Sequence, residues 1–470
     1  MTTGAFEAGR RHTVPAPRLP GRHLPWLGPL PAFHRDPVAL LRTAREQVGN
    51  AFAFPLLGQD VVFLCGPEAH AEVFEADENI LGRREAYRFM KPVFGPGIGY
   101  DATPEEMDAQ IAPLRPALGS RNLDACVRVM EAQARAQVAC WPAEGEIDLL
   151  AELNRMSVAI ATRCLIGEEF HRRMGPELPR LYHDLESGIR LAGMLSPRLP
   201  IPAFRRRDRA RAAIAEAIGK VIAERRRPGN TGPPGPPSGA TGGQDMLAVL
   251  LAARTQDGSP LPDHIVTGIL IGMIFAGQHT SAVLAAWTGV LLLRHPHYIP
   301  RLRAEQQERW PPGSRLGTGV LHRMELLENC VREAERLHPP LILLMRKALR
   351  DTAIRGHHVP AGSLVMVSPA VAHRMPEVFP DPDRFDPSRY TAGRAEHRHP
   401  YALIGFGAGK HRCIGLTFAY LQVKAAWSVL LREVDLWPAQ PGYAPDYSTF
   451  VPAPKAPCTV RYRKRSAEPS

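Results

Sequence analysis

One cysteine stands in a glycine-rich loop at residues 406–415 (FGAGKHRCIG), directly before an apolar run. The glycines Gly407, Gly409 and Gly415 permit backbone conformations that other residues avoid, so N–H groups can turn toward the sulfur and a flat ring can lie close. A free thiol titrates at about pH 8.5, so a thiolate at Cys413 needs donated hydrogen bonds and positive potential. The helix expected after it adds the positive end of its dipole. The loop therefore predicts a metal-binding thiolate.

The cysteine pattern limits the kind of metal. The chain has 7 cysteines, and none of them is paired in a CxxC spacing. Structural zinc takes four such ligands, whereas a single thiolate in a roomy glycine loop suits haem iron. Without the glycines, a lone cysteine would ordinarily be a buried core residue. The scattered cysteines also favour a reducing compartment without disulfides.

The loop FGAGKHRCIG resembles the haem-binding loop of the cytochrome P450 monooxygenases, and its GAGxHRCxG form is most similar to that of the bacterial sterol 14α-demethylase family. This resemblance implies the cytochrome P450 fold, mainly α with a small β lobe, in which a triangular prism of helices surrounds haem b. A single domain over residues 1–470 is expected. The resemblance also implies that Cys413 binds the iron and that Phe406, Gly407 and Gly415 contact the cofactor.

Charge and the N-terminal sequence bear on partners and location. The net charge of +11 is dispersed, which favours solvated helix faces over a nucleic-acid site. Residues 1–30 contain no apolar run, so neither a signal peptide nor a membrane anchor is expected, and the protein should be cytoplasmic. A basic group near the cysteine loop should steer an acidic electron-transfer partner; it consists of Lys410, Arg412, Lys424 and Arg432.

The β lobe is expected near the N-terminus. Residues 51–57 and 61–65 are apolar runs joined by a short turn, which predicts a hairpin. Cap and periodicity signals predict a helix at 36–49 before the hairpin and another at 67–75 after it. The lobe as a whole is expected to comprise about 50–66 together with segments near 340–370 and 445–463.

Most of the remaining chain has a helical pattern. Residues 105–227 are predicted to be helical, with a break at 195–204, where prolines disfavour a helix. Residues 228–243 are rich in proline and glycine and are expected to form a disordered surface loop. Residues 263–294 predict one long helix. Its first apolar stretch is shorter than the about 20 residues of a membrane span, so we expect it to be buried through the centre of the fold.

Polar residues interrupt the middle of that helix. Gly277 costs about 1 kcal/mol in a helix interior, and Thr280 can donate to a carbonyl one turn back, which together open a groove for a diatomic ligand. From these residues alone, a satisfied core threonine and histidine would fit equally well. The segment AGQHTS resembles the family's oxygen-binding segment, with His279 in place of the usual acidic residue, as is typical of sterol 14α-demethylases. This implies that Ala276 and Gly277 face the haem and that Thr280 and His279 deliver protons.

Two segments indicate a pocket for an apolar molecule. Residues 86–101 (AYRFMKPVFGPGIGYD) are aromatic and glycine-rich, which fits a flexible apolar wall, although a packed surface loop can have the same composition. This segment and residues 199–208 (LPIPAFRRRD) resemble substrate-contacting and access regions of the sterol demethylases. The resemblance implies a large apolar substrate, contacted by Tyr87, Phe89, Met90, Phe94, Ala276, His279, Leu341, Leu343, Met345, Phe450 and Val451.

The carboxylates of haem require cations or hydroxyl donors. His411, Arg346 and Tyr87 match family positions for these contacts. The chain departs from its bacterial relatives after Glu105, because basic residues there are replaced by Glu106, Met107 and Asp108. The resemblance therefore implies no propionate contact from these three positions.

Glu333 and Arg336 lie three residues apart on one face of a predicted helix, so they can pair. Taken alone, they would be an ordinary exposed ion pair. The resemblance implies instead a buried network with Arg384, which holds the haem loop in place. Breaking such a network would strand a buried charge.

Together these features predict a haem-thiolate monooxygenase that uses O2. The family resemblance implies oxidative 14α-demethylation of a sterol precursor, with electrons from a ferredoxin and a ferredoxin reductase. A hydroxylase of a terpenoid or another lipophilic metabolite remains an alternative. A non-catalytic haem-binding protein is a further alternative, but it would not need Thr280 and His279. An oxygen-independent isomerase is another, and it would not need Thr280.

Overall fold

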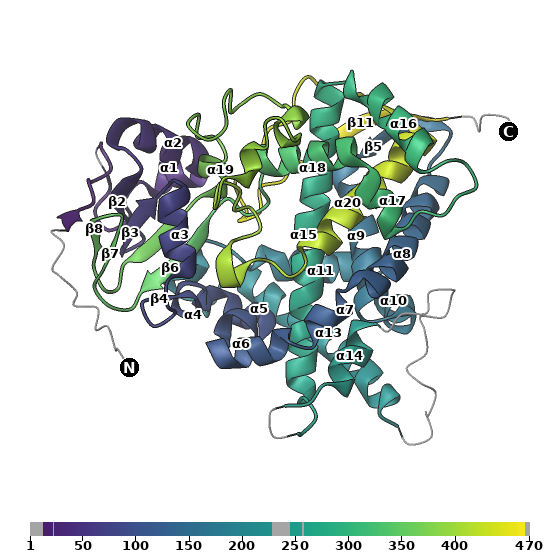
Figure 1. Ribbon diagram of the computed structural model, residues 1–470. Coiled ribbons are helices and arrows are strands. Elements are labelled where there is room, and N and C mark those ends of the chain that lie inside the picture. Colours follow the sequence, from purple (N-terminus) through teal and green to yellow (C-terminus); the bar gives the residue numbers. More distant parts are fainter. Residues whose placement is uncertain (1–12, 22, 228–244, 256–257, 466–470) are drawn as a thin grey trace, which may run out of the picture.

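Helix α15 (Asp263–Arg294) runs through the middle of the fold (Figure 1) and has the bounds predicted from the sequence. The computed structural model describes residues 13–21, 23–227, 245–255 and 258–465, so the predicted loop at 228–243 lies outside the described residues. The helix is long and apolar enough to cross a membrane, but 61% of its most apolar window is buried inside the protein. It is therefore a core helix, as expected.

A five-stranded sheet lies on one side of α15, and most of the helices lie on the other (Figure 1). Its first two strands form the predicted hairpin, in which Phe52 pairs with Phe63 and their rings stack 4.8 Å apart. The strand order is β2 (Ala51–Leu56), β3 (Gln59–Leu64), β9 (Leu364–Val367), β6 (Leu344–Ala348) and β4 (Leu81–Gly82). A second sheet has the order β1 (Val14–Pro15), β8 (His357–Val359) and β7 (Thr352–Ile354).

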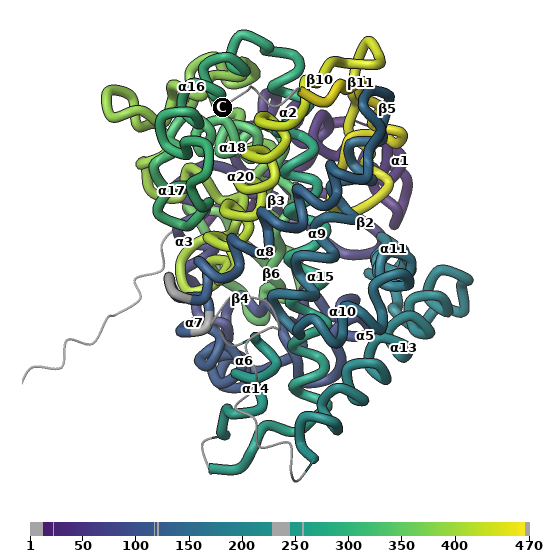
Figure 2. Tube along the Cα trace, turned by 90° about the vertical axis from the view of Figure 1, so that its right-hand side faces the viewer, coloured from purple at the N-terminus to yellow at the C-terminus, as the bar shows by residue number. Residues whose placement is uncertain are grey.

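A third sheet corrects two predictions. It joins β10 (Val434–Pro438), β11 (Thr459–Lys464) and β5 (Glu144–Asp148) at the helical end of the molecule (Figure 2). The predicted lobe segment 445–463 thus contributes its strand to a separate sheet. Strand β5 also interrupts the region predicted to be helical, because its polar residues gain backbone partners only by pairing with β11.

Two hydrophobic cores flank the central part of α15. One fills the β lobe and extends to the first half of α15, and the other surrounds residues 282–293 of its second half. The predicted helices at 36–49 and 67–75 are confirmed. Asp36 caps the first by accepting from the backbone N–H of Ala39 at 2.8 Å.

The helices occupy the following residues: α1 (Leu30–Arg35), α2 (Pro37–Val48), α3 (Pro67–Glu75), α4 (Arg83–Ala86), α5 (Lys91–Phe94), α6 (Pro104–Ile111), α7 (Leu114–Ala117), α8 (Ser120–Ala139), α9 (Leu149–Leu165), α10 (Glu168–Met174), α11 (Leu178–Ser187), α12 (Ala192–Leu195), α13 (Pro202–Arg225), α14 (Met246–Ala252), α16 (Tyr298–Arg309), α17 (Thr318–Arg323), α18 (Glu325–Leu337), α19 (Pro369–Ala372) and α20 (Leu416–Glu433). Of these, α9, α13, α18 and α20 pack directly against α15.

Candidate active site

The cysteine loop lies immediately before α20. Gly407 has φ +69° and Gly409 has φ +57°, so both adopt the left-handed conformation that favours glycine. Gly415 has φ −85° and is the residue before the first turn of α20. A methyl group added there would lie 3.7 Å from the sulfur of Cys413, which is an ordinary contact. Thus two of the three predicted glycines are required by backbone conformation.

Cys413 is an exposed, free cysteine. Its own N–H donates to the carbonyl of Phe406 at 2.8 Å. Surrounding protein raises the pKa of the thiol, and the backbone N–H groups of Gly415 and Leu416 oppose that rise. Burial and these two N–H groups thus act on the thiol in opposite directions, and a bound metal ion would favour the thiolate.

The middle of α15 presents open space. Thr280 donates its hydroxyl to the carbonyl of Ala276 at 2.5 Å, as predicted. Ala276 is exposed although it lies in the central helix, and a side chain added at Gly277 would meet nothing within 4 Å. These residues leave room for a flat ring and a small ligand beside the helix.

His279 has a partner that the sequence did not reveal. Its Nε2 lies 2.8 Å from a carboxylate oxygen of Glu186 on α11, and both side chains are mostly buried. Nε2 of His279 has no hydrogen-bond partner among the described residues, and its contact with Glu186 is an ion pair only when the imidazole is protonated. Only the tertiary packing of α11 near α15 brings the two together.

Aromatic rings from distant segments meet beside the site. Tyr87 stacks on Tyr100 at 4.4 Å, and Phe89 stacks on Phe450 at 5.5 Å. The ring of Phe94 meets that of Phe275, on α15, edge-on at 6.0 Å. Four of the predicted pocket residues thus contact other aromatic rings: Tyr87, Phe89, Phe94 and Phe450. Of the other predicted residues, Met90 and Met345 are buried, and Leu341, Leu343 and Val451 are partly buried.

Arg211 attaches this aromatic segment to α13. Its guanidinium donates to the carbonyls of Val93 and Phe94, at 3.2 and 3.1 Å. Helix α13 begins within the predicted access region, at Pro202. The helix that begins in one of these segments thus contacts the other segment through Arg211.

A group of cationic and hydroxyl donors fits the carboxylates of haem. Arg346 is buried, donates to the carbonyl of Met345 at 2.8 Å and forms no ion pair within the described part of the chain. Such a guanidinium needs an anion, because an unpaired buried charge is costly. The oxygen of Tyr87 accepts from the N–H of Met345 at 3.1 Å, which leaves the hydroxyl hydrogen free to donate. These residues fit haem b.

Two further side chains complete that group. His411 lies 2.8 Å from Glu78, and the Nε of the buried Arg83 lies 3.9 Å from the same carboxylate. His411 and Arg83 lower the pKa of Glu78 to about 2, against the effect of burial. Arg83 could not be predicted as a site residue from its local sequence, because only the fold brings it to His411.

Of the acidic residues after Glu105, Glu106 has a structural role. Glu106 and Thr103 form a reciprocal capping box at the start of α6, with hydrogen bonds of 2.8 and 3.2 Å. The nearby cation Lys91 pairs with Asp101 at 2.9 Å. Lys91 is thereby occupied by a protein carboxylate.

The predicted network at Glu333 is buried, but its third member is different. Arg336 binds Glu333 through two nitrogens, at 2.7 and 2.8 Å, and both side chains are fully buried. Arg389, rather than the predicted Arg384, donates to Glu333 at 3.1 Å. Arg384 is exposed and contributes only its carbonyl, because the turn at 387–390 directs Arg389 inward.

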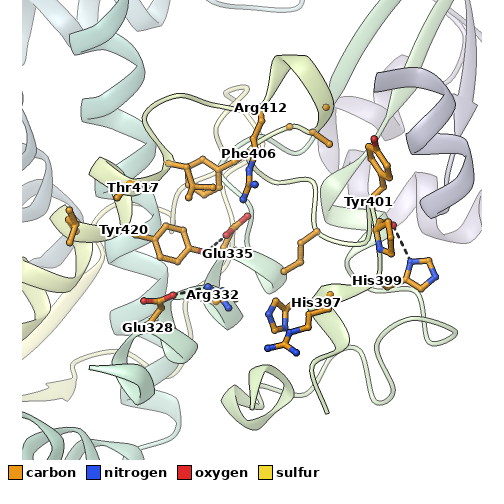
Figure 3. Close-up of a pocket in the computed structure, with 18 of the residues that line it drawn as sticks. Glu328, Arg332, Glu335, His397, His399, Tyr401, Phe406, Arg412, Thr417 and Tyr420 are labelled. Atoms are coloured by element: carbon orange, nitrogen blue, oxygen red, sulfur yellow. Dashed lines mark hydrogen bonds and ion pairs between the residues drawn. The ribbon is translucent and has the colours of Figure 1, made fainter. Parts of the chain in front are cut away.

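A cavity of about 470 Å³ lies beside the cysteine loop (Figure 3). Figure 3 shows Glu335 and Tyr420 joined by a hydrogen bond in its wall, with Arg412 above them. The predicted basic patch is only partly present: Lys410 and Arg412 are exposed, but Lys424 is buried against Glu328 at 2.9 Å. Arg432 lies over the ring of Trp310.

Comparisons with known proteins identify the family of this chain. The family model for cytochrome P450 matches residues 17–450. A sterol 14-demethylase of Arabidopsis thaliana is 37% identical, covering 94% of this chain and 90% of that protein. A sterol 14alpha-demethylase of Mycobacterium tuberculosis is also 37% identical, covering 96% of this chain and 99% of that protein.

Solved structures give the same result. The retinoic acid-bound cyanobacterial CYP120A1 has a TM-score of 0.82 and 26% sequence identity, covering 96% of this chain and all of that chain. The helical core, the small sheets and the match over most of the sequence together assign the fold. This chain belongs to the cytochrome P450 family of haem-dependent monooxygenases.

Proposed function

We propose that this enzyme oxidatively removes the 14α-methyl group of a sterol precursor, with Cys413 as the ligand of haem iron. The observation that carries the proposal is the near full-length similarity to sterol 14-demethylases from a plant and from mycobacteria, at 37–38% identity. His279 and the aromatic segment at 86–101, both typical of that group, are its local support.

Haem b bound at Cys413 supplies the activation of O2 and the oxidation of an unreactive C–H bond. Around it, Arg346 and Tyr87 bind the carboxylates. Thr280, held by the carbonyl of Ala276, faces the open space and can pass a proton through its hydroxyl. His279 can hold a proton, and the carboxylate of Glu186 stabilises the charged imidazole.

The aromatic cluster supports a large, flat, apolar substrate. Rings at Tyr87, Phe89, Phe94 and Phe450 offer wide faces, and their contacts do not fix direction as hydrogen bonds do. A fused-ring sterol presents the matching surface. Binding also excludes water from the space beside Thr280, which limits wasteful loss of reducing equivalents.

Electrons come from a ferredoxin and its reductase in this proposal. The exposed cations Lys410 and Arg412 lie in the cysteine loop, so an acidic partner that binds them approaches the haem from the side of Cys413. A cytoplasmic location is part of the same proposal.

The test is a titration of lanosterol-type sterols against the resting haem spectrum, followed by product analysis with a ferredoxin, its reductase and NADPH. We expect a saturable spectral change and a product lacking the 14α-methyl carbon. A sterol without that methyl group is the control and should bind without losing carbon. No spectral response to any sterol would favour the alternative, a hydroxylase of another lipophilic metabolite.

A further inference from the structure

Two fully buried histidines hold the segment that leads into the cysteine loop. His70, on α3, places Nδ1 3.1 Å from the carbonyl of Tyr401. His373, directly after α19, places Nε2 2.9 Å from the backbone N–H of Ile404. The residues that they hold lie three positions apart, and two residues further along the chain is Phe406, whose carbonyl accepts from Cys413.

The backbone partners determine where each ring carries its hydrogen. A carbonyl only accepts, so His70 carries hydrogen on Nδ1, and its Nε2 is a bare acceptor. An N–H only donates, so Nε2 of His373 is bare, and its hydrogen is on Nδ1. Burial keeps both rings neutral, because it lowers the pKa of His70 to about 4 and that of His373 well below its usual range.

The remaining nitrogens are complementary and unpaired. Nε2 of His70 and Nδ1 of His373 have no hydrogen-bond partner among the described residues. The first can only accept and the second can only donate. Both rings bond to the same four-residue segment, His70 at Tyr401 and His373 at Ile404, so the two side chains meet at one place in the fold. A buried donor and a buried acceptor are rarely left without partners.

Tyr401 supplies an independent reason for this arrangement. Its φ of +58° is the left-handed conformation, which a residue with a bulky side chain seldom adopts. The hydrogen bond from His70 to its carbonyl helps to hold that conformation. In addition, Arg336 of the buried network donates to the carbonyl of His373 at 2.7 Å. The histidines thus connect the β lobe and the network to the same short segment.

We propose that one buried water molecule joins His373 Nδ1–H to His70 Nε2, and that this bridge positions residues 401–404 and, through them, the Cys413 loop. Water accepts from the first ring and donates to the second, which satisfies both nitrogens. A metal ion does not suit this place, because Nδ1 of His373 already carries a hydrogen. The effect on haem rests on the proposed role of Cys413, whereas the water bridge itself does not.

The direct test is a high-resolution structure of the holoenzyme together with ¹⁵N-histidine NMR. We expect an ordered water at about 2.7–3.2 Å from both nitrogens, with hydrogen on Nδ1 of each ring. A dry gap, a direct contact between the rings or hydrogen on Nε2 of His373 would overturn the proposal.

A double-mutant cycle tests the positioning role. His70→Phe and His373→Phe replace each imidazole by a somewhat larger aromatic ring that lacks the nitrogens, and each should raise the rate at which the thiolate carbon monoxide band is lost, on the order of tenfold. Each variant loses its own backbone hydrogen bond together with the shared bridge, so the double variant should be clearly slower in losing the band than the product of the two single effects predicts. If the rate effects of the two single variants simply multiply in the double variant, the bridge is refuted.

His338→Phe is the control, because His338 is a partly buried histidine that stacks on Trp287 at 3.7 Å and has no hydrogen bond to residues 401–404 among the described contacts. In a double variant with His70→Phe, the effects of the two substitutions on the rate of band loss should multiply. If the unmodified enzyme shows no thiolate band, the assignment of Cys413 fails, while the structure and the NMR still decide the bridge.

Discussion

The two sides of the candidate haem site are held by different forces. On the side of Cys413, buried charges make directional hydrogen bonds, as between Glu333, Arg336 and Arg389. On the substrate side, rings such as Phe89 and Phe450 stack face to face, and the main polar attachment is Arg211. Directional bonds between charges fix positions closely, whereas stacked rings can slide at small cost. The first arrangement suits a fixed metal ligand, and the second suits a pocket that adapts to its substrate.

The largest effect is expected at the metal ligand. Cys413→Ala should abolish the carbon monoxide difference band of thiolate-ligated haem, because no other sulfur in the loop can replace it. The measurement is the difference spectrum of reduced protein. Cys140→Ala, at an exposed cysteine on the far end of α8, should keep the band. A persistent band in the first variant would contradict the ligand assignment.

Breaking the charge network should come next. Arg389→Ala should lower the free energy of unfolding by about 3–5 kcal/mol, because it leaves part of the charge of Glu333 unpaired in the interior. Arg384→Ala is the matched control, and its exposed side chain should change that free energy by less than about 0.5 kcal/mol. Urea denaturation of both variants measures the difference. Equal losses would show that the network does not depend on Arg389.

On the Cys413 side, the free energy of unfolding should depend on pH through Glu335. Burial raises the pKa of Glu335 to about 7, although the Tyr420 hydroxyl opposes the rise. In the unfolded chain the pKa of this carboxyl is 4.5. The stabilisation that Glu335 gives the folded state is therefore complete below pH 4.5 and is lost as the pH rises through 7. Glu335→Gln should remove about 2 kcal/mol of the fall in unfolding free energy between about pH 5 and 8. An unchanged slope in urea denaturation would assign the dependence to other groups.

On the substrate side, Thr280→Ala should uncouple electron use from product. Product formed per NADPH should fall about tenfold, since proton delivery fails while reduction continues. Thr288→Ala is the control, because Thr288 donates to the carbonyl of Leu284 in the same way but is fully buried in α15. Its coupling should stay normal. Equal coupling in both variants would remove Thr280 from the proton path.

The smallest effect is expected for Phe450→Leu. Loss of the stack on Phe89 should raise the sterol dissociation constant about fivefold, the worth of one aromatic pair. Unfolding free energy should hardly change, because the ring is only partly buried. A large loss of stability would mean that the aromatic side is as fixed as the Cys413 side.

Local patterns predicted the local structure well. The bounds of α15 and α3 follow from caps and apolar periodicity, and the left-handed glycines follow from the loop composition. Strand β5 could not be predicted, because its partner β11 lies more than three hundred residues away and its own sequence is polar. Arg389 was missed for a similar reason: only the turn before it decides which arginine faces Glu333. Glu186 and Arg83 likewise carry no local signal.

The two hydrogen bonds of Arg211 have a mechanical consequence. Arg211 of α13 donates hydrogen bonds to the consecutive carbonyls of Val93 and Phe94. A shift of that helix therefore moves the pocket wall with it. The opening that admits a bulky substrate and the width of the pocket then change together, because the guanidinium of Arg211 couples the two movements.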